Sequence, residues 1–166
     1  MVGTKKNKMK LILLRHAKTE KVDKNQSDFE RQLLPEGKKQ CEFLRSYFSQ
    51  QKETVNNLYC STAQRTRQTY MEIQSALNEH TMVYKDEFYL CDKRVFLKFL
   101  WELPHGNDLM IIGHNNGISD LAMYFLDEAI LLPTSGLIIL EFNVDKWNMT
   151  SKGLATCVDL YLPQVD

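Results

Sequence analysis

The sequence predicts an α/β fold, a three-layer sandwich in which helices flank a mostly parallel central sheet. Short apolar runs, such as 11–14 and 109–112, alternate with segments whose apolar residues recur at helical spacing. The chain has 166 residues, of which 43% are hydrophobic and 25% charged, as in ordinary globular proteins. A chain of this size can bury one proper core, so we expect a single domain over residues 1–166.

The first half of the chain predicts two strand–helix units, with strands at 11–14 and 57–60. Pro35 suits the first turn of the helix after the first strand. Ser61 or Thr62 can cap the helix after the second strand. Both helices have apolar residues on one face, which are Cys41, Leu44 and Phe48 in the first and Tyr70, Ile73 and Leu77 in the second.

The second half continues the alternation, with a short strand at 82–84 and a buried strand at 109–112. A helix follows each of them, and Asn115 or Asn116 can cap the second helix. The apolar faces of these helices consist of Val95, Phe96, Phe99, Leu100 and Leu103, and of Ile118, Leu121, Ala122 and Phe125.

The last 30 residues change character and favour strands. Residues 137–142 predict a strand, and residues 147–149 together with 155–160 suggest an antiparallel hairpin that turns around 151–153.

Composition and charge narrow the classes of protein. The 21 basic and 21 acidic side chains give a formal net charge of zero, which argues against a general nucleic-acid binder. The apolar run at 11–14 is too short for a secretory signal or a membrane span, so we expect a cytoplasmic protein that does not bind membranes. The cysteines lack the paired spacing of metal ligands and are expected in the core; they are Cys41, Cys60, Cys91 and Cys157.

The first 24 residues are basic despite the neutral total. A run of this kind is usually a solvated tail, but it can also form a positive rim that draws anionic substrates toward His16. Both interpretations stay open from the sequence. The basic residues are Lys5, Lys6, Lys8, Lys10, Arg15, Lys18, Lys21 and Lys24, against Glu20 and Asp23.

Three strand-to-helix junctions carry polar side chains that can act on phosphate. Arg15 and His16 follow the first strand directly. Arg65 lies in the first turn of the helix after the second strand, and the strand at 109–112 runs into Gly113 and His114. The carboxyl ends of parallel strands form the ligand-binding edge of such sheets. Helix amino termini and arginine forks both favour a tetrahedral dianion, so the sequence predicts a phosphate site there.

These junctions resemble the motifs of the histidine phosphatase superfamily, and within it the short SixA-type phosphohistidine phosphatases, which share the phosphoglycerate mutase-like fold. Two departures concern the helix starts, where Leu34 replaces a frequent threonine and Asn116 a frequent proline. The similar segments, in family order, are Leu13-Leu14-Arg15-His16-Ala17, Asp28-Phe29-Glu30-Arg31-Gln32-Leu33 with Pro35 and Gly37, Ser61-Thr62-Ala63-Gln64-Arg65-Thr66-Arg67-Gln68-Thr69, Ile111-Ile112-Gly113-His114-Asn115-Asn116-Gly117, and Pro133-Thr134-Ser135-Gly136.

The resemblance implies a mechanism without metal or cofactor. A neutral ring nitrogen of His16 would attack phosphorus and become transiently phosphorylated, and water would then release phosphate. The nonbridging oxygens would be held by Arg15, Arg65 and His114. Of these, His114 would be most effective in its cationic form. Residues expected to support substrate binding are Thr19, which equally suits a loop end, Arg31, which can instead pair with Asp28, and Asn115, which can instead cap its helix.

The group that leaves phosphorus decides between two enzymatic hypotheses. An alkoxide needs a proton donor, and Glu87 is the best-placed candidate, with a solvated carboxylate as the alternative. An imidazole, whose conjugate acid has a pKa of roughly 6.5, leaves readily without one. The first hypothesis is therefore a phosphohistidine phosphatase acting on a phosphorylated protein, for which a histidine phosphotransfer domain is a candidate.

The second hypothesis is a phosphomonoesterase of the same superfamily that uses Glu87 and acts on a small phosphorylated metabolite. A third is a noncatalytic phosphate-binding module, against which the complete set of arginines and histidines argues. Arg67 falls two residues beyond Arg65 on the same helix and is expected to point elsewhere.

Overall fold

A single six-stranded sheet forms the centre of the protein, in the order β3-β2-β4-β1-β5-β6. The computed structural model describes residues 8–51 and 53–163. Strands β1 to β4 run parallel, while β5 runs antiparallel to β1 and to β6. The strands are β1 (Met9–Arg15), β2 (Asn57–Ser61), β3 (Thr81–Lys85), β4 (Leu109–Gly113), β5 (Leu137–Phe142) and β6 (Thr156–Tyr161).

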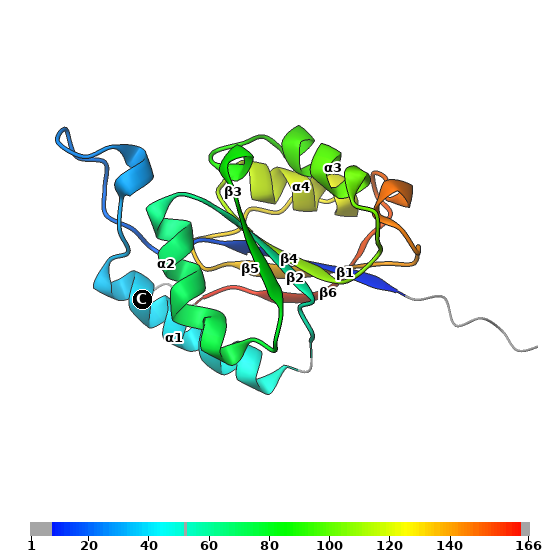
Figure 1. Ribbon diagram of the computed structural model, residues 1–166, viewed down its shortest axis with the longest axis horizontal. Coiled ribbons are helices and arrows are strands. Elements are labelled where there is room, and N and C mark those ends of the chain that lie inside the picture. Colours follow the sequence, from blue (N-terminus) through cyan, green and yellow to red (C-terminus); the bar gives the residue numbers. More distant parts are fainter. Residues whose placement is uncertain (1–7, 52, 164–166) are drawn as a thin grey trace, which may run out of the picture.

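Helices cover both faces of this sheet, which confirms the predicted three-layer sandwich (Figure 1). One pair packs on each face, α1 with α2 and α3 with α4. Single 3-10 turns, η1 to η4, lie in the connections. The helices are α1 (Pro35–Gln50), α2 (Gln64–Ile73), α3 (Lys93–Glu102) and α4 (Gly117–Leu126), and the turns are η1 (Asp28–Glu30), η2 (Gln74–Ala76), η3 (Asp86–Phe88) and η4 (Trp147–Met149).

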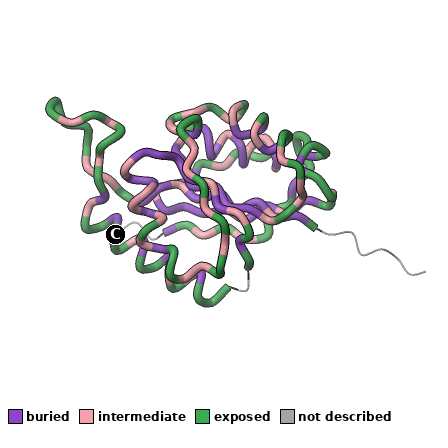
Figure 2. The backbone as a smooth tube through the Cα atoms, in the orientation of Figure 1, coloured by how far each residue is buried: buried purple, intermediate pink, exposed green. Residues whose placement is uncertain are grey.

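Burial of β1 on both faces explains its continuous apolar sequence. Leu11 and Leu13 pack with the α3–α4 layer, whereas Ile12 and Leu14 pack with the α1–α2 layer. Alternate residues of a strand point to opposite faces, so a strand covered on both sides needs apolar residues at every position. The buried segments accordingly run through the middle of the molecule (Figure 2).

The strand order places three strand-to-helix junctions side by side. Strand β4 lies between β1 and β2, and Arg15 at the end of β1 pairs in register with Gly113 at the end of β4. The next residue of β1's loop, His16, donates its backbone N–H to the carbonyl of Gly113. The side chains that follow β1, β2 and β4 therefore start from one short edge of the sheet.

The connection from β1 to α1 projects beyond the sheet as a loop (Figure 1). It folds back on itself through a bridge between Thr19 and Leu33 and a backbone hydrogen bond from Glu20 to Gln32. The start of helix α1 packs closely against this loop. A Cβ added at Gly37 would come within 2.1 Å of the Lys18 carbonyl oxygen, so this close approach requires glycine.

The basic start of the chain divides between the two ends of β1. Lys8 and Lys10 pair with Glu141 and Glu53. Lys18, Lys21 and Lys24 are exposed in the loop after β1, while Lys5 and Lys6 lie outside the described residues. In the part of the chain that the structure describes, no helix is long and apolar enough to cross a membrane.

The predicted closing hairpin is wrong in one arm. Residues 147–149 form the turn η4, and β6 pairs with β5 instead. Trp147 is fully buried in the α3–α4 layer, and its indole N–H donates to the Asn107 carbonyl oxygen at 3.2 Å. Burial of this side chain pulls the segment out of strand geometry. Cys157 on β6 is exposed, which corrects its expected place in the core.

Candidate active site

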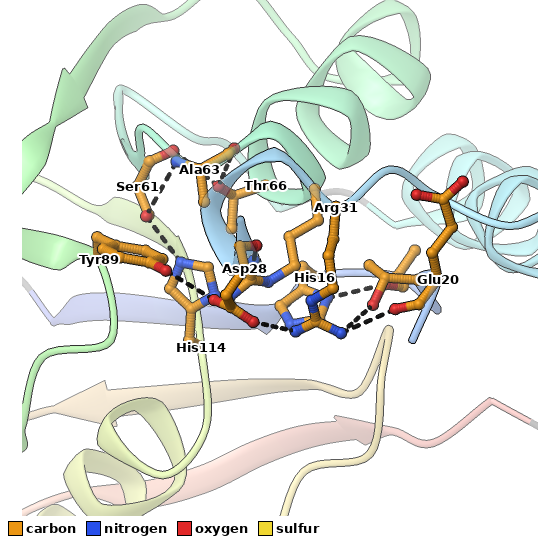
Figure 3. Close-up of polar contacts among 12 residues, drawn as sticks. His16, Glu20, Asp28, Arg31, Ser61, Ala63, Thr66, Tyr89 and His114 are labelled. Carbon is orange, nitrogen blue, oxygen red and sulfur yellow. Dashed lines mark hydrogen bonds and ion pairs between the residues drawn. The ribbon is translucent and has the colours of Figure 1, made fainter. Parts of the chain in front are cut away.

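His16 lies at the centre of the cluster formed by the three junctions (Figure 3). Only 6% of its surface is exposed. Its Nδ1 lies 2.8 Å from the carbonyl oxygen of Ala17, which can only accept a hydrogen bond, so Nδ1 carries the proton of the neutral ring. Burial, together with nearby arginines, lowers the pKa of His16 to about 3. The ring is therefore neutral near pH 7 and keeps a lone pair on Nε2.

A second buried histidine faces the first, with the ring centroids of His16 and His114 5.3 Å apart. The Nε2 of His114 lies 2.7 Å from the Ser61 hydroxyl oxygen, while Nδ1 is buried and has no partner among the described residues. Burial and the neighbouring His16 lower the pKa of His114 to about 2. Without a ligand this ring is neutral, and a hydroxyl that donates to Nε2 leaves the hydrogen on Nδ1.

The position of the Ser61 hydroxyl corrects its expected role as a helix cap. Helix α2 is capped by Ala63 without a side-chain hydrogen bond, and the Ser61 hydroxyl contacts His114 instead (Figure 3). Thr62 does not cap α2 either; its carbonyl accepts from the Nε of Arg67. Arg67 also lies over the ring of Tyr84, away from the cluster as expected.

Three arginines from separate elements surround the histidines. Arg65 reaches in from the first turn of α2 with 1% of its surface exposed, Arg15 ends β1, and Arg31 follows η1. Each guanidinium is close enough to contribute to the lowered pKa of His16. Arg15 donates from Nη1 to the Leu132 carbonyl at 2.9 Å.

Unpartnered donors concentrate at this cluster. Five buried side-chain polar atoms lack a hydrogen-bond partner among the described residues, and four of them belong to it, with His105 Nδ1 as the fifth. A buried donor without an acceptor costs free energy, so its presence points to a ligand that supplies the acceptor. The four atoms are the Nε of Arg15, Arg31 and Arg65 and the Nδ1 of His114. Such a set suits an oxyanion.

Two residues that were not candidate site residues join the cluster, although the sequence did offer Asp28 as an ion-pair partner of Arg31. The Asp28 carboxylate accepts from Arg31, Arg65 and the phenol of Tyr89 (Figure 3). Burial alone would raise the pKa of Asp28, but these donors bring it below its usual value. The ring of Tyr89 meets that of His114 edge to face at 5.7 Å. The segment that resembles the family contains Asp28, whereas nothing in the sequence marked Tyr89.

The candidate binding residues differ in what they contact. Arg31 donates through Nη1 to the Thr19 hydroxyl at 3.0 Å, so Thr19 braces this arginine. Asn115 does not cap α4. Its amide donates to the Leu132 carbonyl, which also accepts from Arg15, and its oxygen accepts from Ser119. Asn116 is the cap of α4 but makes no side-chain cap hydrogen bond, contrary to expectation.

Glu87, the candidate proton donor, lies apart from these contacts. Its carboxylate pairs with Lys85 at 3.0 Å and its side chain is half exposed. A hydrogen bond from its own backbone and the Lys85 partner lower the pKa of Glu87. The carboxylate is therefore ionised near neutral pH and lacks the proton that a general acid must donate. Within the described residues, no group of three His, Cys, Asp or Glu side chains could hold a metal ion.

Comparison with known protein families finds a match in the first half of the chain. Residues 11–89 match the histidine phosphatase superfamily (branch 1). Comparison with curated protein sequences finds no match.

Several solved structures share the whole fold. The candidate phosphohistidine phosphatase SixA of Agrobacterium tumefaciens is 25% identical with a TM-score of 0.81, and the match covers 93% of this chain and 98% of that one. The protein histidine phosphatase SixA complexed with tungstate is 18% identical with a TM-score of 0.70, covering 87% and 97%. A phosphoglycerate mutase from Plasmodium falciparum is 15% identical with a TM-score of 0.65, covering 96% of each chain.

Proposed function

Because residues 11–89 match the histidine phosphatase superfamily and the whole fold is similar to a SixA-type structure, we propose that this phosphatase hydrolyses phosphohistidine on proteins, with His16 as the phosphate acceptor. The observation that carries this proposal is the set of four unpartnered donors around a neutral imidazole. The likeness to SixA-type structures supports the substrate class.

The first step transfers the phosphoryl group to the enzyme. The lone pair on Nε2 of His16 attacks phosphorus, and the P–N bond to the substrate imidazole breaks with its electron pair going to the departing nitrogen. The departing imidazole takes a proton from solvent. Arg15, Arg65 and His114 hold the nonbridging oxygens, where added charge develops during transfer.

The second step restores the enzyme. Water attacks the phosphorus on Nε2, the P–N bond to His16 breaks, and phosphate leaves while the proton of the water passes to solvent or product. The hydrogen bond from Nδ1 to the Ala17 carbonyl keeps the same tautomer throughout. A bound phosphate dianion favours protonation of His114, so this ring would become a cationic donor only when the site is occupied.

The absence of a protonated carboxyl group among the described contacts supports a P–N substrate. Glu87 is ionised and paired with Lys85, and Asp28 is held in its anionic form. An alkoxide leaving group would need a donor, whereas imidazole, with a conjugate-acid pKa of roughly 6.5, does not.

The surroundings of the site leave room for a protein substrate. A groove of about 430 Å³ lies between the loop around η1 and the start of α2, and we propose that it receives chain flanking the phosphohistidine. A histidine phosphotransfer domain is the partner we propose, and the cytoplasm the location. The groove is lined by Gln26, Phe29, Glu30, Gln32 and Gln64.

A side-by-side assay tests the proposed substrate. Wild-type protein and Glu87→Gln are given a phosphorylated histidine phosphotransfer domain and a panel of small phosphoesters. We expect rapid turnover of the protein substrate by both. Efficient turnover of esters alone, slowed in Glu87→Gln, would establish the small-molecule phosphomonoesterase instead. Binding of phosphate without any turnover would establish a noncatalytic module.

A further inference from the structure

The Asp28 carboxylate occupies a special place in the cluster because it joins three elements. Its Oδ1 lies 2.8 Å from Nη2 of Arg31, and its Oδ2 lies 3.0 Å from Nη2 of Arg65. The Tyr89 hydroxyl donates to Oδ2 at 2.7 Å. One side chain thereby connects the loop after β1, the start of α2 and the residue after η3.

Asp28 binds one particular edge of Arg65. Its backbone carbonyl accepts from Nη1 at 2.7 Å and its carboxylate from Nη2 at 3.0 Å, so the two terminal nitrogens are both engaged. The Nε of Arg65 is buried and without a partner among the described residues. A guanidinium is a rigid plane with a second donor edge formed by Nε and a terminal nitrogen. Fixing the terminal edge therefore fixes where the Nε edge lies.

Arg31 repeats this arrangement. Its Nη2 contacts Asp28, its Nη1 donates to Thr19 and to the Glu20 carbonyl, and its Nε is again buried and unpartnered (Figure 3). In both arginines, acceptors of the protein bind the terminal nitrogens, while Nε has no hydrogen-bond partner among the described residues.

Electrostatics gives a reason for an anion at this point. Arg15, Arg31 and Arg65 approach one another around His16, and burial together with the charge of Arg65 lowers the pKa of Arg15. Like charges in a partly desolvated cluster repel one another. Among the described contacts of Arg31 and Arg65 in the ligand-free enzyme, Asp28 is the only negatively charged partner.

We propose that Asp28 is a positioning residue, held by Tyr89, that fixes the terminal edges of Arg31 and Arg65 so that their Nε edges are preorganised for the phosphoryl oxygens. This rests on the proposed phosphatase function of the site. It adds Arg31 to the phosphate-binding arginines and assigns Asp28 a role through them, without contact to the reacting atoms.

The opposite role for Asp28 makes a contrary prediction. If its carboxylate competed with phosphate for the arginines, removing its charge would tighten phosphate binding. If it positions them, removing its charge lets both side chains take other rotamers, and the entropy of ordering them opposes phosphate binding.

Binding of inorganic phosphate, measured by calorimetry on the full chain, separates these roles without reference to any substrate. We expect Asp28→Asn to weaken phosphate binding about tenfold or more, Tyr89→Phe to weaken it severalfold, and Asp28→Glu to recover part of the loss. Asp92→Asn is the matched control, since Asp92 binds Arg94 through a similar but exposed pair, and it should bind phosphate as the wild type does.

Melting temperature and kinetics complete the test. The positioning role predicts a lower kcat in Asp28→Asn, because the preorganised arginines act in the transition state. The melting temperature of this variant should also fall, since Arg31 and the buried Arg65 lose their counter-charge, so kcat and phosphate binding are compared below the melting transition of both proteins. Unchanged or tighter phosphate binding in both Asp28→Asn and Tyr89→Phe would overturn the proposal. Phosphate binding that responds as expected in an enzyme unable to hydrolyse phosphohistidine would instead overturn the proposed substrate.

Discussion

The Nδ1 of His16 lies 2.8 Å from the carbonyl oxygen of Ala17, the next residue in the chain. Because a carbonyl cannot donate, this contact fixes the neutral tautomer and leaves the lone pair on Nε2. Burial lowers the pKa of the same ring to about 3, so the ring does not lose this lone pair to a proton between pH 5 and 8. Orientation and ionisation thus both suit a nucleophile.

The lowered pKa values predict how stability depends on pH. His16 and His114 have folded pKa values of about 3 and about 2, below the roughly 6.5 of an unfolded histidine. At pH values between the folded and the unfolded pKa, the unfolded chain binds more protons than the folded protein. The free energy of unfolding therefore falls as the pH falls below about 6.5. Each ring contributes up to about 1.4 kcal/mol per pH unit.

Urea denaturation of the ligand-free protein at pH 4.5 and 7 measures this dependence. His16→Asn and His114→Asn should each reduce the difference in unfolding free energy between the two pH values. A difference as large in both variants as in the wild type would show that these rings are not the groups responsible.

Arg65 and Arg67 provide a matched pair on one helix. Arg65→Lys removes a planar fork from the cluster and should lower kcat by about 100-fold or more, because a point charge cannot replace donors preorganised for an oxyanion. Arg67→Lys loses only its stacking on Tyr84 and its bond to Thr62, so it should keep kcat while losing about 1 kcal/mol of stability. Equal kcat losses in both variants would contradict the assignment.

Ser61→Ala tests the hydroxyl that contacts His114 Nε2 at 2.7 Å. Without it the ring loses its orientation and a buried nitrogen loses its partner, at a cost of about 1–3 kcal/mol. We expect kcat to fall about tenfold. Ser61→Thr, which keeps a hydroxyl, should retain more of the activity than Ser61→Ala, and steady-state kinetics of the two variants checks this order. The same rate in both would remove the hydroxyl from the account.

Gly37→Ala tests the packing of α1 against the loop that carries Thr19 and Asp28. An added Cβ would lie 2.1 Å from the Lys18 carbonyl oxygen, so the backbone must move. We expect a loss of about 2 kcal/mol or more, seen as a lower midpoint in chemical denaturation. Gly153→Ala in a remote turn has more room, although its φ of +70° disfavours alanine, and should cost about 1 kcal/mol. A smaller loss in Gly37→Ala than in Gly153→Ala would contradict this packing.

Local sequence pattern predicts the fold well because both sheet faces are covered. The run 11–14 is apolar at every position for that reason, and the face of α4 with Ile118, Leu121, Ala122 and Phe125 is buried as predicted. The prediction of a strand at 147–149 is wrong, because burial of Trp147 in the α3–α4 layer outweighs the strand propensity of this segment.

The site, like the fold, has residues that the sequence predicts and residues that it does not. Residues at strand ends, such as His16 and His114, can be predicted because topology alone brings them together. The ion pair of Asp28 with Arg31 is local and could be anticipated, whereas the contacts of Asp28 with Arg65 and Tyr89 depend on long-range packing of turns. Ser61 has a local alternative as a helix cap that the sequence cannot reject. Side-chain hydrogen bonds between distant loops therefore become visible only in three dimensions.

The most direct measurement concerns the phosphoryl group on His16. Wild-type protein and His16→Ala are mixed with a radiolabelled phosphohistidine protein, quenched within milliseconds to seconds and separated by size. We predict a label on the wild-type enzyme that survives base and is lost in acid, as expected of a P–N bond, and no label on His16→Ala. A label that survives acid, or one that persists on His16→Ala, would contradict phosphoryl transfer to this histidine.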